Sequence, residues 1–318
     1  AIELVSSLRE QEQLHVEDGV CTVDADAEQI RQSVPETLEG VVLSRLDRLP
    51  SDEQLTVKVA SVIGRSFLLR TVHGVHPARR SAAALRAHLD HTCDLRLTVL
   101  EAEEPEANYA FLHAIMRQVT YDTLLFEQRR QLHRSVATWV EETYADALEP
   151  YVPLLAVHWN GAGHTEKEYE YCCRAGIQAA ARHANTEADG YFTRALSLLD
   201  RLGEPTGSAR RVDVLKRQTA VLAVLGRVDE ERSVLERLAA AAEHGTIERG
   251  PVLLLWADFH RRCGRFSEAR EASERALTAM QDERDRLGEA RALAQIGSAL
   301  EGAGAFQEAG EVVRRALD

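Results

Sequence analysis

Apolar positions along most of the chain recur every three or four residues, which is the period of an amphipathic α-helix. The spacing is clear in residues 113–148, where the apolar positions include Ile115, Val119, Leu132, Val136, Trp139 and Val140. Aromatic residues make up only 5% of the sequence, while Ala, Leu, Glu and Arg are abundant. Because these abundant residues favour helix, the sequence predicts a mainly α protein.

The helical period gives way to strict alternation at two places. Residues 14–24 alternate on either side of Asp18-Gly19, a dipeptide typical of tight turns. Residues 96–113 alternate again and turn at Pro105. Both stretches are therefore predicted to form small β-hairpins.

Two well-delimited helices are predicted between these hairpins. The first begins at Pro35 and closes at Pro50, which cannot continue a helix. The second begins at Ser51, where Gln54 three residues later suits a capping box, and it stops at Gly64.

A short helix from about Phe67 and a longer one near residues 79–95 follow. Together with the helix that begins at residue 51, they form a group of three helices. The hairpin of residues 96–113 comes directly after this group. Three helices followed by a β-hairpin is the order of a winged-helix domain.

From residue 150 onward the chain repeats a helix-turn-helix pattern. Similar turn segments end at residues 168, 188, 231, 269 and 309. Apart from the first interval, which is too short for a full repeat, the spacing is close to 40 residues, which is typical of a helical solenoid. The small and large positions of each copy agree with the tetratricopeptide pattern. Those of one copy are Trp256, Ala257, Gly264, Phe266, Ala269 and Ala276.

Residues 39–67, residues 109–141 and the repeats together resemble one family. The chain is similar to the C-terminal arm of large bacterial signal-transduction ATPases of the STAND class. Such arms accompany adenylate/guanylate cyclase domains, and looser relatives occur in LuxR-type transcription regulators. The resemblance implies that residues 1–34 end a nucleotide-binding region. It further implies a winged helix over 35–112, linking helices over 113–149 and repeats over 150–318.

The chemistry of that family is missing from this sequence. No GxxxxGK[ST] loop is present, since no Gly is followed by Lys. Without this loop there is no backbone cradle for phosphates. We therefore expect no catalytic, cofactor-binding or metal-binding residues in the chain. The resemblance implies that any ATP or ADP binds elsewhere in a longer parent protein, whose nucleotide-binding domain would be a partner of this chain.

Two groups of histidines are candidates for reactive sites. His113 and His133 suggest a general base or a metal pair, but packing at a helix junction is the simpler interpretation. His88 and His91 are spaced to share a metal on one helix face. No CxxC, HxxxH or HExxH motif accompanies them, so a zinc site is not expected.

The repeats contain the best candidate binding site. In a tetratricopeptide array, the first helix of each pair lines the concave face. The polar residues expected on this face are Lys216, Asp258, Arg261, Arg262, Arg291 and Ser298. A row of basic side chains could capture an acidic peptide or protein. Solvated side chains in salt bridges are the structural alternative.

Charge and composition limit the partners. The net charge is -13, and residues 79–106 contain more acids than bases, so nucleic-acid binding is disfavoured. Apolar runs such as residues 252–257 are far shorter than the roughly 20 residues of a membrane span. Five Cys without a CxxC pair indicate reduced thiols and a cytoplasmic protein.

The sequence therefore predicts a non-catalytic sensor and interaction arm. A stand-alone adaptor that binds an acidic peptide and a DNA-binding regulator module stay open as alternatives.

Overall fold

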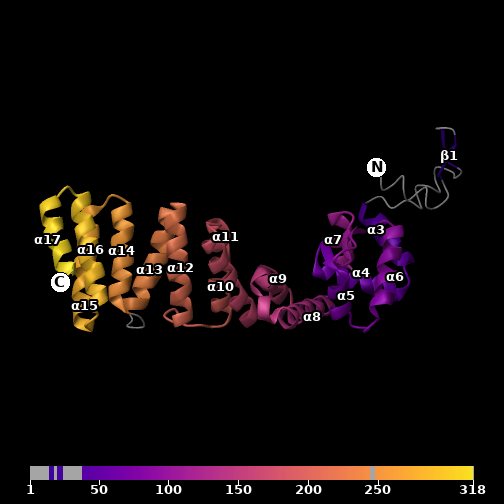
Figure 1. Ribbon diagram of the computed structural model, residues 1–318, viewed down its shortest axis with the longest axis horizontal. Coiled ribbons are helices and arrows are strands. Elements are labelled where there is room, and N and C mark those ends of the chain that lie inside the picture. Colours follow the sequence, from indigo (N-terminus) through magenta and orange to yellow (C-terminus); the bar gives the residue numbers. More distant parts are fainter. Residues whose placement is uncertain (1–13, 18–19, 24–37, 244–247, 318) are drawn as a thin grey trace. The chain divides into compact units, whose positions relative to one another are not determined.

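The structure is a computed structural model in which the chain is mainly helical, as predicted (Figure 1). It describes residues 14–17, 20–23, 38–243 and 248–317. The chain divides into two compact units. The N-terminal unit contains residues 1–151 and 157–164, and the repeat unit contains residues 152–156 and 165–318.

The first hairpin is confirmed. Strand β1 (Leu14–Glu17) pairs antiparallel with β2 (Val20–Val23), and Leu14 lies opposite Val23. The predicted Asp18-Gly19 turn lies outside the described residues. So do the helix start at Pro35 and most of the segment assigned to a nucleotide-binding region.

Four helices begin the packed part of the N-terminal unit. They are α3 (Leu38–Arg48), α4 (Ser51–Ile63), α5 (Leu69–Val75) and α6 (Ala82–Asp94). Helix α4 is central because it contacts α5, α6 and two later helices, α7 (Ala114–Asp122) and α8 (Phe126–Thr143). Its Val57 is fully buried, as are Leu85 and Leu89 of α6. These apolar side chains form part of the core of this unit.

The predicted capping box at Ser51 is wrong. Ser51 is the first residue of α4 and Pro50 is the N-cap, which has no side-chain hydrogen bond to the helix. The Gln54 amide instead donates to the carbonyl of Leu49 at 2.9 Å. The predicted helix end is confirmed, since Gly64 is the C-cap and its N–H donates to the Ala60 carbonyl.

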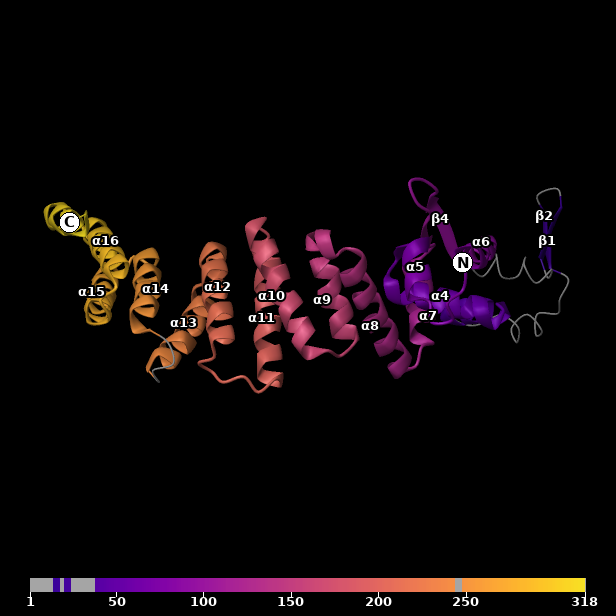
Figure 2. The same cartoon turned by 60° about the horizontal axis from the view of Figure 1, so that its bottom comes forward.

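A three-stranded antiparallel sheet has the order β3-β5-β4. The strands are β3 (Ser66–Leu68), β4 (Thr98–Ala102) and β5 (Asn108–Phe111). The predicted hairpin is confirmed as β4 and β5, and its loop extends away from the helices of the unit (Figure 2). The predicted short helix is confirmed as α5, but it begins at Leu69, and Phe67 belongs to β3. Phe67 pairs with Tyr109 of β5, and the two rings stack at 6.2 Å.

The rest of the N-terminal unit continues as helix. The segments are α7 (Ala114–Asp122), α8 (Phe126–Thr143), short 3₁₀ turns at Ala145–Ala147 and Glu149–Tyr151, and α9 (Val152–Gly161), whose last part belongs to this unit. Helix α8 buries Leu132, Val136 and Val140, as its periodicity predicts. The ring of Trp139 packs edge-on against Tyr144 at 6.0 Å.

Antiparallel helix pairs form the repeat unit, and each helix contacts the next (Figure 1). They are α10 (Thr165–Ala181), α11 (Asn185–Arg201), α12 (Ala209–Leu225), α13 (Val228–Glu243), α14 (Arg249–Arg262), α15 (Phe266–Glu283), α16 (Arg286–Gly302) and α17 (Phe306–Leu317). The predicted solenoid is therefore confirmed, and the short first interval is occupied by α10.

Small residues let the paired helices approach closely. A Cβ on Gly176 of α10 would lie 2.7 Å from the ring of Phe192 on α11, so only glycine fits there. Ala276 of α15 is fully buried. The turns inside the last two pairs contain Gly264 and Gly304 at positive φ, a conformation that glycine adopts without strain. The small residues of the repeat pattern thus mark positions where neighbouring helices are in close contact.

Candidate functional site

Helix α14 presents two opposite faces. One face carries Trp256 and His260, which are four residues apart and whose rings stack at 5.5 Å. Asp258 lies midway between them in sequence. Because successive residues of an α-helix are about 100° apart, Asp258 projects from the opposite side. The predicted binding residues of α14 therefore lie on one face, while the aromatic pair occupies the other.

The predicted residues of α14 form an ion cluster. The Asp258 carboxylate accepts hydrogen bonds from Arg261 at 2.6 Å and Arg262 at 2.9 Å. Arg262 also donates to Glu231 of α13, which is 1% exposed. Burial raises the pKa of Asp258, but the two guanidinium bonds outweigh it and hold the pKa below its usual value. Much of the basic charge of Arg261 and Arg262 is therefore neutralised within the chain.

The other predicted residues stand apart from this cluster. Lys216 on α12, Arg291 on α16 and Ser298 on α16 are exposed. Within the described ranges, neither Lys216 nor Arg291 lies within ion-pair distance of a carboxylate. Helices α14 and α16 contact each other directly. The structure thus brings Asp258, Arg261 and Arg262 together and leaves two free cations on the neighbouring first helices.

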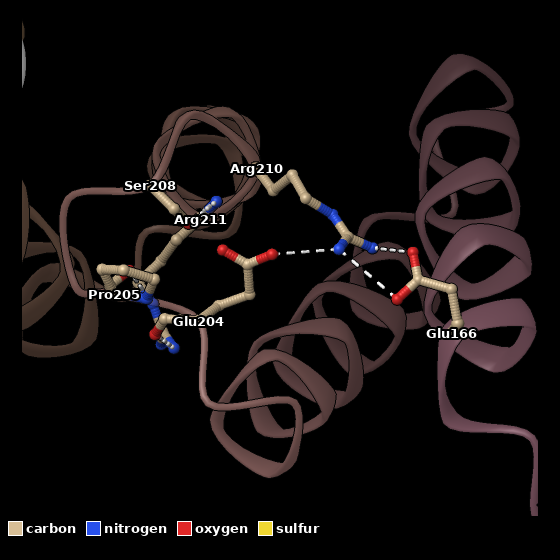
Figure 3. A network of polar contacts seen from close by, with 6 residues as sticks. All are labelled: Glu166, Glu204, Pro205, Ser208, Arg210 and Arg211. Atoms are coloured by element: carbon tan, nitrogen blue, oxygen red, sulfur yellow. Dashed lines mark hydrogen bonds and ion pairs between the residues drawn. The ribbon is translucent and has the colours of Figure 1, made fainter.

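Arginines near the start of α12 have a structural role (Figure 3). Arg210 donates to Glu166 of α10 at 2.6 Å and to Glu204 of the preceding loop at 3.1 Å. Arg211 is buried and donates to the Glu204 carbonyl, while its own N–H donates to Ser208, the N-cap of α12. These bonds fix the loop between α11 and α12. The two guanidinium groups are therefore engaged within the protein.

The aromatic face of α14 forms the floor of a groove of about 550 Å³. Val252, Leu253, Trp256 and His260 lie on this floor, and residues of α13 and α15 form the walls. The sequence reasoning did not identify this groove, since it treated Trp256 as a repeat marker. The available signal was the spacing of Arg249, Val252, Leu253, Trp256 and His260 on one helical face.

His260 lines this groove beside Trp256. Burial lowers its pKa, and the nearby positive charge of Arg265 lowers it further. Its Nδ1 atom is buried and has no hydrogen-bond partner among the described residues. The imidazole ring extends the stacked aromatic surface of Trp256.

A second histidine cluster is buried in the N-terminal unit. His133 of α8 and His158 of α9 face each other with their Nδ1 atoms 2.9 Å apart. The hydroxyl of Tyr121 lies 3.0 Å from Nε2 of His133. Two Nδ1 atoms at this distance form a hydrogen bond in which one is the donor and the other the acceptor. The accepting imidazole must therefore be uncharged. The predicted packing is thus right for His133, whereas His113 is exposed.

The histidines considered for zinc have separate partners. His88 lies 2.9 Å from the hydroxyl of Thr56, and His91 pairs with Glu53 at 2.6 Å. Across the described residues, no group of three or more His, Cys, Asp or Glu side chains could hold a metal ion. In the same residues, no helix is long and apolar enough to cross a bilayer.

Comparison with known families identifies the repeats. The tetratricopeptide repeat family matches residues 249–318, which contain α14 to α17. A curated relative, Uncharacterized protein R02095 of Rhizobium meliloti (strain 1021), is 26% identical over 166 residues. This stretch is 52% of the present chain but only 16% of the relative. The chain therefore corresponds to a minor part of that relative's length.

Solved structures with similar folds are distant in sequence. The nearly identical TPR-like repeats of a Podosopora anserina protein give a TM-score of 0.48 at 13% identity, over 60% of this chain and 92% of that one. The apo form of RapI gives 0.47 at 9% identity, over 99% and 72%. A STAND protein with a tetratricopeptide repeat sensor from Pyrococcus horikoshii gives 0.27 at 11% identity, over 91% and 60%. At these scores the structural similarities do not support a specific function.

Proposed function

We propose that this chain is the non-catalytic sensor and protein-interaction arm of a multidomain signal-transduction ATPase. The observation that carries the proposal is the presence of tetratricopeptide repeats, which are interaction modules, after a separate small α/β unit. Tetratricopeptide repeats are typically non-catalytic interaction scaffolds.

The order of elements in the N-terminal unit supports a winged-helix assignment. Helix α4 is followed by β3, α5, α6, β4 and β5, which places a β-hairpin after three helices. On this assignment the winged helix comprises residues 35–112, and α7 and α8 lie in linking helices over 113–149. The repeats would then extend over 150–318, and residues 1–34 would end the nucleotide-binding region.

In the proposed mechanism, the repeats capture a protein or peptide and the N-terminal unit relays this event. Binding would favour one of two conformations of the parent protein, and so release or restrain its nucleotide-binding domain. ATP or ADP would bind in that domain. The present chain would contribute no group to the chemical step.

The charge of the N-terminal unit does not favour a DNA-binding role. Arg86 pairs with Glu103 of the β4–β5 loop at 2.6 Å, and Arg70 pairs with Glu106 at 2.8 Å. These pairs occupy two guanidinium groups that could otherwise contact a phosphate backbone. The alternative of a stand-alone peptide adaptor shares the same repeats and differs only in lacking a parent ATPase.

Lys216 and Arg291 are the cations that we propose for partner binding, with Arg261, Arg262, Asp258 and Ser298 completing the surface.

The test uses arrays of synthetic peptides with an increasing number of Glu residues, probed with the purified chain. Capture should increase with Glu content and be lost in the Lys216→Glu/Arg291→Glu variant. The control variant, Arg314→Glu on α17, should bind like the wild type. Equal capture by all three proteins would refute this binding surface.

A further inference from the structure

A second groove lies in the N-terminal unit, between α4 and α8, which contact each other. Its volume is about 490 Å³, which is within the range of small-molecule sites. The lining residues of α4 run from Ser51 to Lys58, and those of α8 run from Gln128 to Ser135. Each stretch covers seven helical steps, which corresponds to about 10 Å along the helix axis. A groove of this length suits a small molecule better than a protein segment.

The middle of each lining stretch is apolar. Leu55 of α4 and Leu132 of α8 each lie four residues after the first lining residue of their helix. Leu124, in the turn before α8, also lines the groove. Leu124 and Leu132 are buried, and Leu55 is half-buried. These side chains provide an apolar surface on which the body of a ligand can pack.

Polar groups with free hydrogen-bonding capacity surround this apolar surface. The side-chain oxygen of Gln128 accepts a hydrogen bond from the Leu125 N–H at 3.0 Å, so its NH₂ group remains available as a donor. Among the described residues, the side chains of Ser51, Gln131 and Ser135 have no hydrogen-bond partner. The groove therefore offers several neutral donors to a bound molecule.

The charge of the groove is positive. Among the described residues that line it, Lys58 is the charged one. Lys58 is half-buried, and no carboxylate of the described residues lies within ion-pair distance of it. The carboxylates next to the lining residues in sequence are bound by groups outside the groove: Asp52 by Arg80, Glu53 by His91 and Glu127 by Arg130. In a chain with a net charge of -13, this groove therefore favours an anion.

We propose that the groove between α4 and α8 binds a small carboxylic acid with an apolar body. The carboxylate pairs with Lys58 and accepts hydrogen bonds from the neighbouring amide and hydroxyl groups. The apolar body packs on Leu55 and Leu132. One cation among neutral donors matches a single negative charge. The site lies wholly within the N-terminal unit, so it is independent of partner binding by the repeats.

The test titrates the purified chain with octanoate by calorimetry, and octanamide serves as the matched neutral ligand. Octanoate should bind, whereas octanamide should bind roughly tenfold more weakly because it cannot pair with Lys58. Lys58→Gln should weaken octanoate binding by a similar factor and leave octanamide binding unchanged. The control variant is Arg134→Gln, which removes an exposed cation of α8 that does not line the groove. This control should bind octanoate like the wild type.

Two variants at Gln131, an exposed position of α8, provide a second test if Lys58→Gln does not fold. Gln131→Glu should weaken octanoate binding and Gln131→Lys should strengthen it, since the two variants place opposite charges in the groove. Failure of octanoate to bind would overturn the proposal. So would equal binding of octanoate and octanamide, or octanoate binding that is unchanged in Lys58→Gln and in both Gln131 variants. Each of these outcomes would leave the proposed function intact.

Discussion

The imidazole pair of the N-terminal unit makes a specific prediction about stability and pH. His133 and His158 are 7% and 1% exposed, and they share one hydrogen bond through their Nδ1 atoms. We consider the His158→Asn variant. The Asn amide can still occupy the position of the Nδ1 atom, but it cannot take up a proton near neutral pH.

The magnitude follows from the difference between the folded and unfolded states. Burial lowers the pKa of His133 to about 4, with a further contribution from Arg117 and Arg129, and it lowers the pKa of His158 to about 3. An unfolded chain protonates histidine below about pH 6.5. As the pH falls from 6.5 towards 4, the unfolded state therefore binds protons that the folded state does not. At pH 5 this lowers the free energy of unfolding by about 2 kcal/mol for each imidazole.

The assay is urea unfolding at pH 7 and pH 5, followed by tryptophan fluorescence in a Trp256→Phe background. The remaining Trp139 and Trp159 report on the N-terminal unit. Lowering the pH should destabilise His158→Asn by about 2 kcal/mol less than the parent protein, because one titrating imidazole has been removed. An unchanged pH dependence in His158→Asn would refute the reasoning.

Two further predictions concern the repeat unit. Gly176→Ala should destabilise it by about 1–3 kcal/mol because the new Cβ meets the Phe192 ring, as thermal unfolding followed by circular dichroism would show. Gly190→Ala, which meets no atom within 4 Å, should instead stabilise it by about 0.5–1 kcal/mol, and a loss of stability there would contradict the packing argument. Glu231→Ala should lower the free energy of urea unfolding by about 1–3 kcal/mol, since Arg262 loses its buried partner. An unchanged free energy of unfolding would mean that the ion pair with Asp258 is sufficient to hold Arg262.

The helical part of the fold was largely predictable from the sequence. The repeats bury residues at positions such as Ala276 and Phe192, which is what the period of three to four residues and the small-residue pattern require. Strand β3 was missed because three residues are too few to show alternation. Its pairing with β5 depends on residues about 40 positions away. The capping box failed because a sequence pattern does not fix which residue is the N-cap.

The candidate sites were harder to predict because they depend on contacts between distant residues. Nothing near His133 in the sequence indicates His158, since the two meet only when α8 packs against α9. Likewise, the predicted row of exposed basic residues took no account of Glu231. This residue lies 31 residues before Arg262 and neutralises part of its charge. Local spacing shows which residues share a helical face, but only packing shows which charges remain free.

The most direct test of the central claim is the size of the native gene product, measured by immunoblot of source-cell lysate with an antibody against this chain. If the chain is an arm of a multidomain ATPase, the antibody should detect a band far above the 35.3 kDa of this chain. A single band at about that mass would contradict the claim and favour a stand-alone adaptor.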